Sequence, residues 1–201
     1  GMKELTFESV QSALDVGPRF DAFKLATHYW EARYLSEVEE RLQMAADIDD
    51  AKSPPKLERQ YRRLAKLFPC FVSTLYTLPG RFIGWNQEDL PLFDVIDLLI
   101  VDEAGQVSPE IGVASFTLAK RALVVGDVDQ IPPVWSIPHS IDGPNALRHK
   151  VVEDRLKIEE FLDSGLSASR GSLMRVAQRA TPYSKHPTRG RGMFLNEYRR
   201  C

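Results

Sequence analysis

The sequence predicts an α/β fold in which part of a parallel sheet is flanked by helices and preceded by a helical segment. Two short aliphatic runs, 95–101 and 122–125, each end in polar residues that include carboxylates. Short aliphatic runs of this kind are typical of parallel strands that are covered on both faces. Residues 1–68 instead show apolar side chains at helical spacing, which indicates amphipathic helices. Both patterns together predict a mixed α/β architecture.

The helical segment divides into two expected helices. Residues 18–46 carry aromatic and aliphatic side chains mostly three to four positions apart, and the stretch 49–55, with its Asp and Pro residues, interrupts them. A second amphipathic helix follows, with apolar positions Leu57, Tyr61, Leu64 and Leu67. Two interpretations of the pair stay open: an ordinary helical hairpin with an aromatic core face, or a surface that grips nucleic acid.

The central part of the chain predicts the sheet. Strands are expected near 70–74, 95–101 and 122–126, with a helix at 109–120 between the last two. Ser108 suits the cap of this helix, and the proline after it suits the first turn.

The last third of the chain is expected to be mainly helix and loop. Residues 135–145 contain three prolines and predict a loop, followed by helices near 151–162 and 172–180. The polar stretch 182–192 is expected to be flexible, and 193–195 to be a short strand.

The polar residues that end the two aliphatic runs are the candidate functional site. In open α/β sheets, ligands bind beyond the carboxyl ends of the strands, so both clusters are expected to face one ligand. Hard cations prefer carboxylate and water oxygens. The simplest ligand for such a site is a nucleoside triphosphate bound to a metal ion. The side chains concerned are Asp102, Glu103, Gln106, Asp127 and Gln130.

These clusters carry a resemblance to a known family. The segments DEAGQ (102–106) and GDVDQIPP (126–133) resemble the Walker B motif and motif III of superfamily 1 helicases, in the branch with DEAxQ and GDxxQLPP. The segment 194–200, FLNEYRR, resembles motif IV, which opens the second RecA-like domain. The segment 71–75, FVSTL, is similar to the strand and loop that precede Walker B and touch single-stranded nucleic acid.

The resemblance implies a role for each matching residue. Asp102 would hold Mg²⁺ through water, and Glu103 would orient and polarise the attacking water. Gln130 would couple the γ-phosphate to the nucleic-acid site, and Arg199 would reach that phosphate across the domain cleft. The remaining positions are Gln106, Gly126 and Asp127 for the nucleotide and its magnesium, and Ser73 and Thr74 for nucleic acid.

The resemblance also implies a domain organisation. It divides the chain into a helical insertion at 1–68, a partial RecA-like domain at 69–192, and the start of a second RecA-like domain at 193–201. The sequence contains no phosphate-binding loop of the form G-x-x-x-x-G-K-[ST], and it ends inside the motif IV match.

We therefore expect part of an ATP-dependent DNA or RNA helicase that is not competent for catalysis alone. Mg²⁺ and ATP are the cofactors of the intact family, and single-stranded nucleic acid is its partner; the possibility that this chain binds no cofactor stays open. Two other functions stay open. One is a nucleic-acid-binding or protein-interaction module that keeps the helicase shape, and the other is an ATPase completed by a second polypeptide.

Composition and charge limit the possible cellular locations and partners of the protein. The net charge is −2, and no apolar run reaches the length of a membrane span. The two cysteines, Cys70 and Cys201, provide neither a disulfide framework nor a zinc site, which favours a reducing cytoplasm. Residues 170–201 are basic, and two interpretations stay open: a segment that faces phosphate, or a solvated connection between motor domains. The basic residues are Arg170, Arg175, Arg179, Lys185, Arg189, Arg191, Arg199 and Arg200, and the single acid is Glu197.

The edge of the expected sheet gives one further prediction. In RecA-like sheets the motif III strand lies between the Walker B strand and the phosphate-loop strand, so its outer edge is expected to be open here. Because an exposed edge offers unpaired backbone groups, we expect another chain to pair with it, as in a homo-oligomer, or the C-terminal segment to cover it.

Overall fold

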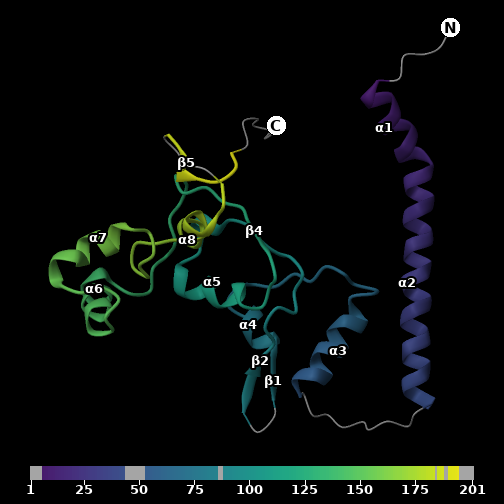
Figure 1. Ribbon diagram of the computed structural model, residues 1–201, viewed down its shortest axis with the longest axis horizontal. Coiled ribbons are helices and arrows are strands. Elements are labelled where there is room, and N and C mark those ends of the chain that lie inside the picture. Colours follow the sequence, from purple (N-terminus) through teal and green to yellow (C-terminus); the bar gives the residue numbers. More distant parts are fainter. Residues whose placement is uncertain (1–5, 44–52, 86–87, 184, 188–189, 195–201) are drawn as a thin grey trace. The chain divides into compact units, whose positions relative to one another are not determined.

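The computed structural model has a mixed α/β architecture with two compact units (Figure 1). The first unit comprises 1–73 with 83–90, and the second comprises 74–82 with 91–201. The structure describes residues 6–43, 53–85, 88–183, 185–187 and 190–194. None of the helices in these ranges is long and apolar enough to cross a membrane.

The first unit contains the predicted helical pair and one further helix. Helix α1 (Phe7–Val16) begins at Thr6, whose hydroxyl accepts a hydrogen bond from the Ser9 amide, and α2 (Pro18–Gln43) follows. Helix α3 (Pro54–Leu64) begins within the stretch 49–55 that was expected to interrupt the helices, and the proline in its first turn is compatible with a helix start. The Glu37 carboxylate of α2 forms an ion pair with Lys66, just beyond α3.

The aromatic face of α2 does not form the expected core. No residue of α2 is buried, and Phe20, Phe23 and Tyr29 remain mostly exposed. The interpretation of the pair as a hairpin with an aromatic core face is therefore wrong for the described residues. A helical spacing shows which side chains share a face, but it does not show what covers that face.

The strand expected near 70–74 is also absent. Residues 70–74 have irregular backbone, and Val72 is 96% exposed. The neighbouring strands are β1 (Ile83–Trp85) and β2 (Asp89–Pro91), which pair in a two-stranded sheet. Apolar composition suggested a strand at 70–74, but no neighbouring strand in the described residues supplies the hydrogen bonds that a strand needs.

The second unit contains the predicted parallel strand pair. Strands β3 (Leu99–Val101) and β4 (Ala122–Val124) are parallel, with Leu99 opposite Ala122 and Val101 opposite Val124. Helix α5 (Pro109–Phe116) connects them, as predicted, although it is shorter than expected. The sheet is covered on one face only, because Leu99 and Val101 are 8% and 3% exposed while Ile100 is 61% exposed.

The outer edge of β4 has no strand partner within the described residues, where the sheet consists of β3 and β4 alone. The described part of the C-terminal segment does not pair with it, since β5 (Lys185–His186) and β6 (Gly190–Arg191) pair with each other. Pairing with another chain stays a prediction.

The last third of the unit departs from the sequence prediction in two places. Helix α6 (His139–Arg148) lies where a loop was expected, with Pro144 inside it. The helix expected near 151–162 begins late, as a short 3-10 turn at Arg155–Lys157 followed by α7 (Ile158–Asp163). The reason is local: the Asp154 carboxylate accepts hydrogen bonds from the amides of Leu156 and Lys157, which starts the helix at this point.

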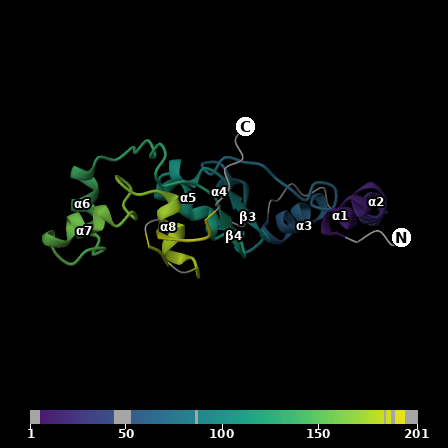
Figure 2. The same ribbon diagram turned by 90° about the horizontal axis from the view of Figure 1, so that it is seen from above.

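Helix α8 (Leu173–Ala180) matches its prediction and completes the core. Its cap is Ser172, whose hydroxyl accepts a hydrogen bond from the Arg175 amide. Figure 2 shows α8 beside α5, and the fully buried Leu173 packs against Gly112 of α5. The strand expected at 193–195 is wrong for Met193 and Phe194, which have irregular backbone, and Leu195 lies outside the described residues.

Candidate functional site

The loops that follow β3 and β4 lie against each other, backbone to backbone. The Ala104 amide donates a hydrogen bond to the Val125 carbonyl at 2.9 Å, and the Val125 amide donates to Val101 at 2.8 Å. A Cβ at Gly105 would lie 2.1 Å from the Asp127 carbonyl oxygen, and one at Gly126 would lie 2.8 Å from the Gly105 nitrogen. Only residues without a side chain permit this approach, so the two loops fit together because each carries a glycine.

The first loop presents two carboxylates to solvent. Asp102 and Glu103 are both exposed, and the Glu103 amide donates a hydrogen bond to Asp102 Oδ1 at 2.9 Å. Glu103 has a left-handed backbone with φ 53° and ψ 36°, an uncommon conformation for a residue with a side chain. Such a conformation persists only where surrounding contacts impose it, and here the next residue, Ala104, is completely buried.

Each loop pairs a carboxylate with its own amide side chain. Gln106 Nε2 donates to Glu103 Oε2 at 3.3 Å, and Gln130 Nε2 donates to Asp127 Oδ2 at the same distance. Asp127 Oδ1 also accepts from the Asp129 amide at 2.9 Å. The two pairs orient the amides before any ligand is bound.

The other predicted site residues lie elsewhere or outside the described residues. Ser73 belongs to the first unit and Thr74 to the second, in an irregular segment rather than a strand. The hydroxyls of Thr74 and Thr77 share a hydrogen bond of 3.0 Å. Arg199 lies outside the described residues, so its predicted role is not part of this geometry.

One carboxylate of the two loops is open to a metal ion. In the part of the chain that the structure describes, no three His, Cys, Asp or Glu side chains group as a site that could hold a metal ion. Magnesium is usually held by one or two carboxylates, with water and substrate phosphates as the other ligands. The exposed Asp102 carboxylate satisfies this requirement, because only its Oδ1 accepts a hydrogen bond from a described residue.

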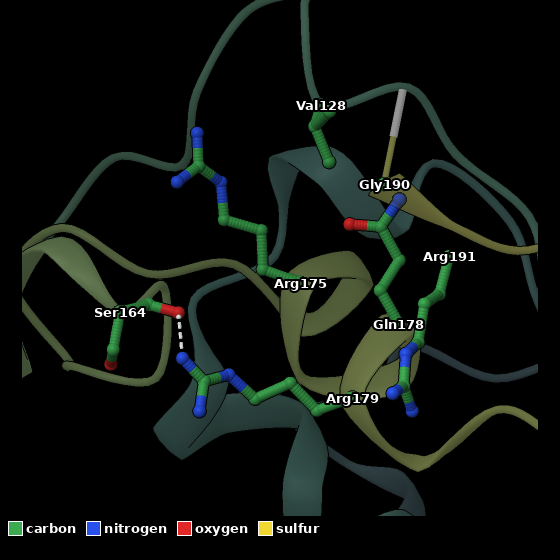
Figure 3. A pocket seen from close by; sticks show the side chains of 7 residues that line it. All are labelled: Val128, Ser164, Arg175, Gln178, Arg179, Gly190 and Arg191. Atoms are coloured by element: carbon green, nitrogen blue, oxygen red, sulfur yellow. Dashed lines mark hydrogen bonds between the residues drawn. The ribbon is translucent and has the colours of Figure 1, made fainter. Parts of the chain in front are cut away.

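A pocket that the sequence did not reveal lies beside the second loop (Figure 3). Its volume is about 760 Å³, and it is lined by Val128, Ser164, Arg175, Gln178, Arg179, Gly190 and Arg191. Val128 directly follows Asp127, so the pocket adjoins the GDVDQ loop. The sequence feature that could have indicated this pocket is the spacing of Arg175, Gln178 and Arg179, which places all three on one face of a helix.

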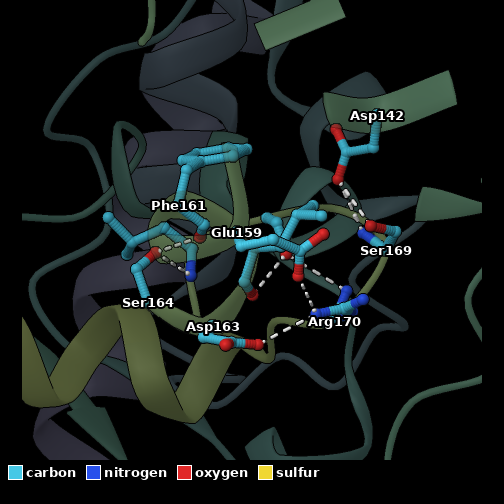
Figure 4. Close-up of polar contacts among 10 residues, drawn as sticks. Asp142, Glu159, Phe161, Asp163, Ser164, Ser169 and Arg170 are labelled. Carbon is cyan, nitrogen blue, oxygen red and sulfur yellow. Dashed lines mark hydrogen bonds and ion pairs between the residues drawn. The ribbon is translucent and has the colours of Figure 1, made fainter. Parts of the chain in front are cut away.

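Not all arginines of the basic segment 170–201 line this pocket, because Arg170 forms ion pairs elsewhere (Figure 4). Its guanidinium forms ion pairs with Asp163 at 2.9 Å and Glu159 at 3.1 Å. The hydrogen bonds from Arg170 to these two carboxylates raise its pKa above the usual value. Nearby, the Asp142 carboxylate accepts hydrogen bonds from the Ser169 amide and hydroxyl, which anchors the same segment.

Comparisons of the chain with protein-family models, with curated proteins and with solved structures found no match.

Proposed function

We propose that the chain is part of a superfamily 1 helicase, and that its two loops form the part of an ATPase site that handles magnesium and the attacking water. The observation that carries the proposal is the contact between the DEAGQ and GDVDQ loops, in which Gly105 lies directly against the Asp127 carbonyl. Either motif alone would be weak support for a helicase. In this structure the two motifs follow the two strands of one parallel pair. A RecA-like sheet and the domain division at residues 68 and 192 are part of this proposal.

The proposed mechanism assigns each exposed side chain a task. Magnesium, when bound, supplies charge that neutralises the β- and γ-phosphates. Asp102 holds the ion through its waters, and Glu103 accepts a proton or hydrogen bond from the attacking water. Gln106 keeps the Glu103 carboxylate oriented, and Gln130 does the same for Asp127 until a phosphate competes for its amide.

The sequence has no G-x-x-x-x-G-K-[ST] loop, and such a loop supplies the lysine and backbone amides that hold the phosphates. We therefore propose that the chain alone binds nucleotide weakly and does not hydrolyse it. A cytoplasmic setting and single-stranded nucleic acid as the partner of the whole helicase belong to the same proposal.

A second candidate function is a binding module without motor activity. The observation that favours it is the exposed aromatic face of α2, where Phe20 and Phe23 are 63% and 72% exposed. Exposed aromatic side chains are suited to stacking on unpaired bases or to contact with another protein. Single-strand binding that is lost when Phe20 and Phe23 are both replaced by alanine would support this candidate.

Calorimetric titration of Mg²⁺-ATP into the purified chain tests the first candidate. We expect measurable binding that Asp102→Asn abolishes. Glu160→Gln is the control, because Glu160 is an exposed carboxylate on α7 away from both loops. If the wild-type chain releases no heat, the loops do not form a nucleotide site by themselves. If Asp102→Asn binds as well as the wild type, Asp102 does not hold the magnesium.

A further inference from the structure

The pocket beside the GDVDQ loop gathers three arginines from two elements. Arg175 and Arg179 extend from α8, and Arg191 enters from β6 (Figure 3). Residues four apart on a helix are neighbours on its surface, so α8 supplies two of these charges from one face. The pocket is a depression open to solvent, with a volume of about 760 Å³.

The positive charge of the pocket is not compensated by its lining. Among the described residues that line it, none is an Asp or Glu. The contrast with Arg170 is direct, because that guanidinium has two carboxylates within 3.1 Å. Arginines that have no carboxylate partner among the described residues, and that line one pocket, raise the local concentration of anions.

Local contacts hold two of the arginines in position. Arg179 Nη2 donates a hydrogen bond to the Ser164 carbonyl at 3.0 Å, and its other N–H groups have no hydrogen-bond acceptor among the described residues. The aliphatic stem of Arg175 lies over Gly165, where a Cβ would be 2.6 Å from Arg175 Cδ. Gly165 also has a φ of +82°, a conformation that favours glycine. The glycine thus permits both the turn and the close packing of the Arg175 stem.

We propose that this pocket binds phosphate groups, as a second anion site that is separate from the Asp102 carboxylate. The planar guanidinium fork matches the oxygens of phosphate and can form paired hydrogen bonds with them. The three groups lie around the pocket and point in different directions, so each can bind a separate phosphate oxygen of one ligand (Figure 3). That ligand is either the phosphate chain of a nucleotide or successive phosphates of a nucleic-acid backbone. The site goes beyond the proposed function, because it requires neither Asp102 nor magnesium.

Binding of two probes to the full chain, in buffer without magnesium, tests this site. Inorganic triphosphate is titrated by calorimetry, and a fluorescent oligodeoxythymidylate is titrated by anisotropy at several salt concentrations. The variant is Arg175→Gln/Arg179→Gln, which keeps long side chains while it removes two charges. Arg148→Gln is the control, since Arg148 is an exposed arginine at the end of α6 in the same unit. Circular dichroism compares the folding of all variants.

We expect the double variant to weaken binding by about 100-fold, because each charged hydrogen bond contributes about tenfold or more in affinity. Arg148→Gln and Asp102→Asn should bind as the wild type does. For the oligonucleotide, the slope of log affinity against log salt should become about 1.4 less steep when two phosphate contacts are removed.

The outcomes separate the two sources of phosphate and the two sites. Loss of triphosphate binding alone in the double variant identifies a nucleotide-type ligand, and loss of oligonucleotide binding alone identifies a nucleic-acid backbone. The proposal is overturned if neither probe binds the wild type, or if a folded double variant binds both probes as the wild type does. Equal weakening by Arg148→Gln would overturn it too, since general positive charge would then explain the binding. Loss of binding in Asp102→Asn without magnesium would place the phosphate at the other site and also overturn it.

If the double variant is unfolded, Arg191→Gln replaces it. Arg191 is exposed on β6, and its guanidinium accounts for one of the three charges. A loss of about tenfold in affinity supports the site, and unchanged affinity overturns it.

Discussion

Replacement of Gly105 by alanine should separate the two loops of the candidate site. The added Cβ would lie 2.1 Å from the Asp127 carbonyl oxygen and 3.0 Å from its carbon, and both are backbone atoms. Real Cβ contacts essentially never fall below 3.0 Å, so the loops must move apart. That movement strains the hydrogen bond of 2.9 Å between the Ala104 amide and the Val125 carbonyl.

The expected loss of stability follows from these two effects. Overpacking of a close contact costs about 1–3 kcal/mol, and a weakened hydrogen bond adds about 0.5–1.5 kcal/mol. We therefore expect Gly105→Ala to lower the free energy of unfolding by about 1.5–4.5 kcal/mol, as measured by urea denaturation. The midpoint should fall, and the slope should change little if the native state keeps its compactness.

Gly80→Ala is the matched control for this measurement. Gly80 lies in helix α4 (Leu78–Arg81) of the same unit, and a Cβ there would meet no atom within 4 Å. Because alanine favours a helix over glycine by about 1 kcal/mol, this variant should be as stable as the wild type or slightly more stable. If both variants have the same midpoint, the loops are not in close backbone contact, and the description of the site is wrong.

The remaining predictions concern a cap and an ion pair. Ser172→Ala should cost about 1 kcal/mol of unfolding free energy, because the Ser172 hydroxyl accepts a hydrogen bond from the Arg175 amide at the start of α8. Ser108→Ala should lower the unfolding free energy by less, because Ser108 caps α5 without a side-chain hydrogen bond. A larger loss of stability in Ser108→Ala than in Ser172→Ala would contradict this prediction. The hydrogen bond from Lys66 is the main reason why the pKa of Glu37 lies below its usual 4.5. A lowered pKa in the folded chain stabilises it above pH 4.5, and this contribution is lost as the pH falls through the folded-state pKa. The Glu37 side chain is 34% exposed, so water screens its ion pair with Lys66. In urea denaturation at neutral pH, the unfolding free energies of wild type and Glu37→Gln should therefore differ by less than about 1 kcal/mol. This difference should vanish in acid. A difference that grows in acid would contradict the assignment.

Prediction from sequence was most successful where a short segment determines its own structure. The aliphatic runs before Asp102 and Gly126 became parallel strands, and Ser172 began α8. It failed at residues 70–74, at the loop expected over 135–145 and at the start of the helix expected near 151–162. Residues 70–74 are as apolar as a strand but have no neighbouring strand to pair with in the described residues, and Pro144 lies inside a helix rather than in a loop.

The sequence by itself determined the chemistry of the candidate site. The carboxylates and amides at 102–106 and 126–130 follow aliphatic runs, and a run of that kind places the polar residues after it at the end of a strand. The tertiary structure decided how closely the two loops approach, because the contact between Gly105 and Asp127 depends on the register of β3 against β4. It also decided how the arginines are paired: Arg170 forms ion pairs with two carboxylates, whereas Arg175 and Arg179 line a pocket in which no described residue is a carboxylate. Spacing along a chain fixes which side chains share a face, but charge compensation depends on residues that only folding brings together.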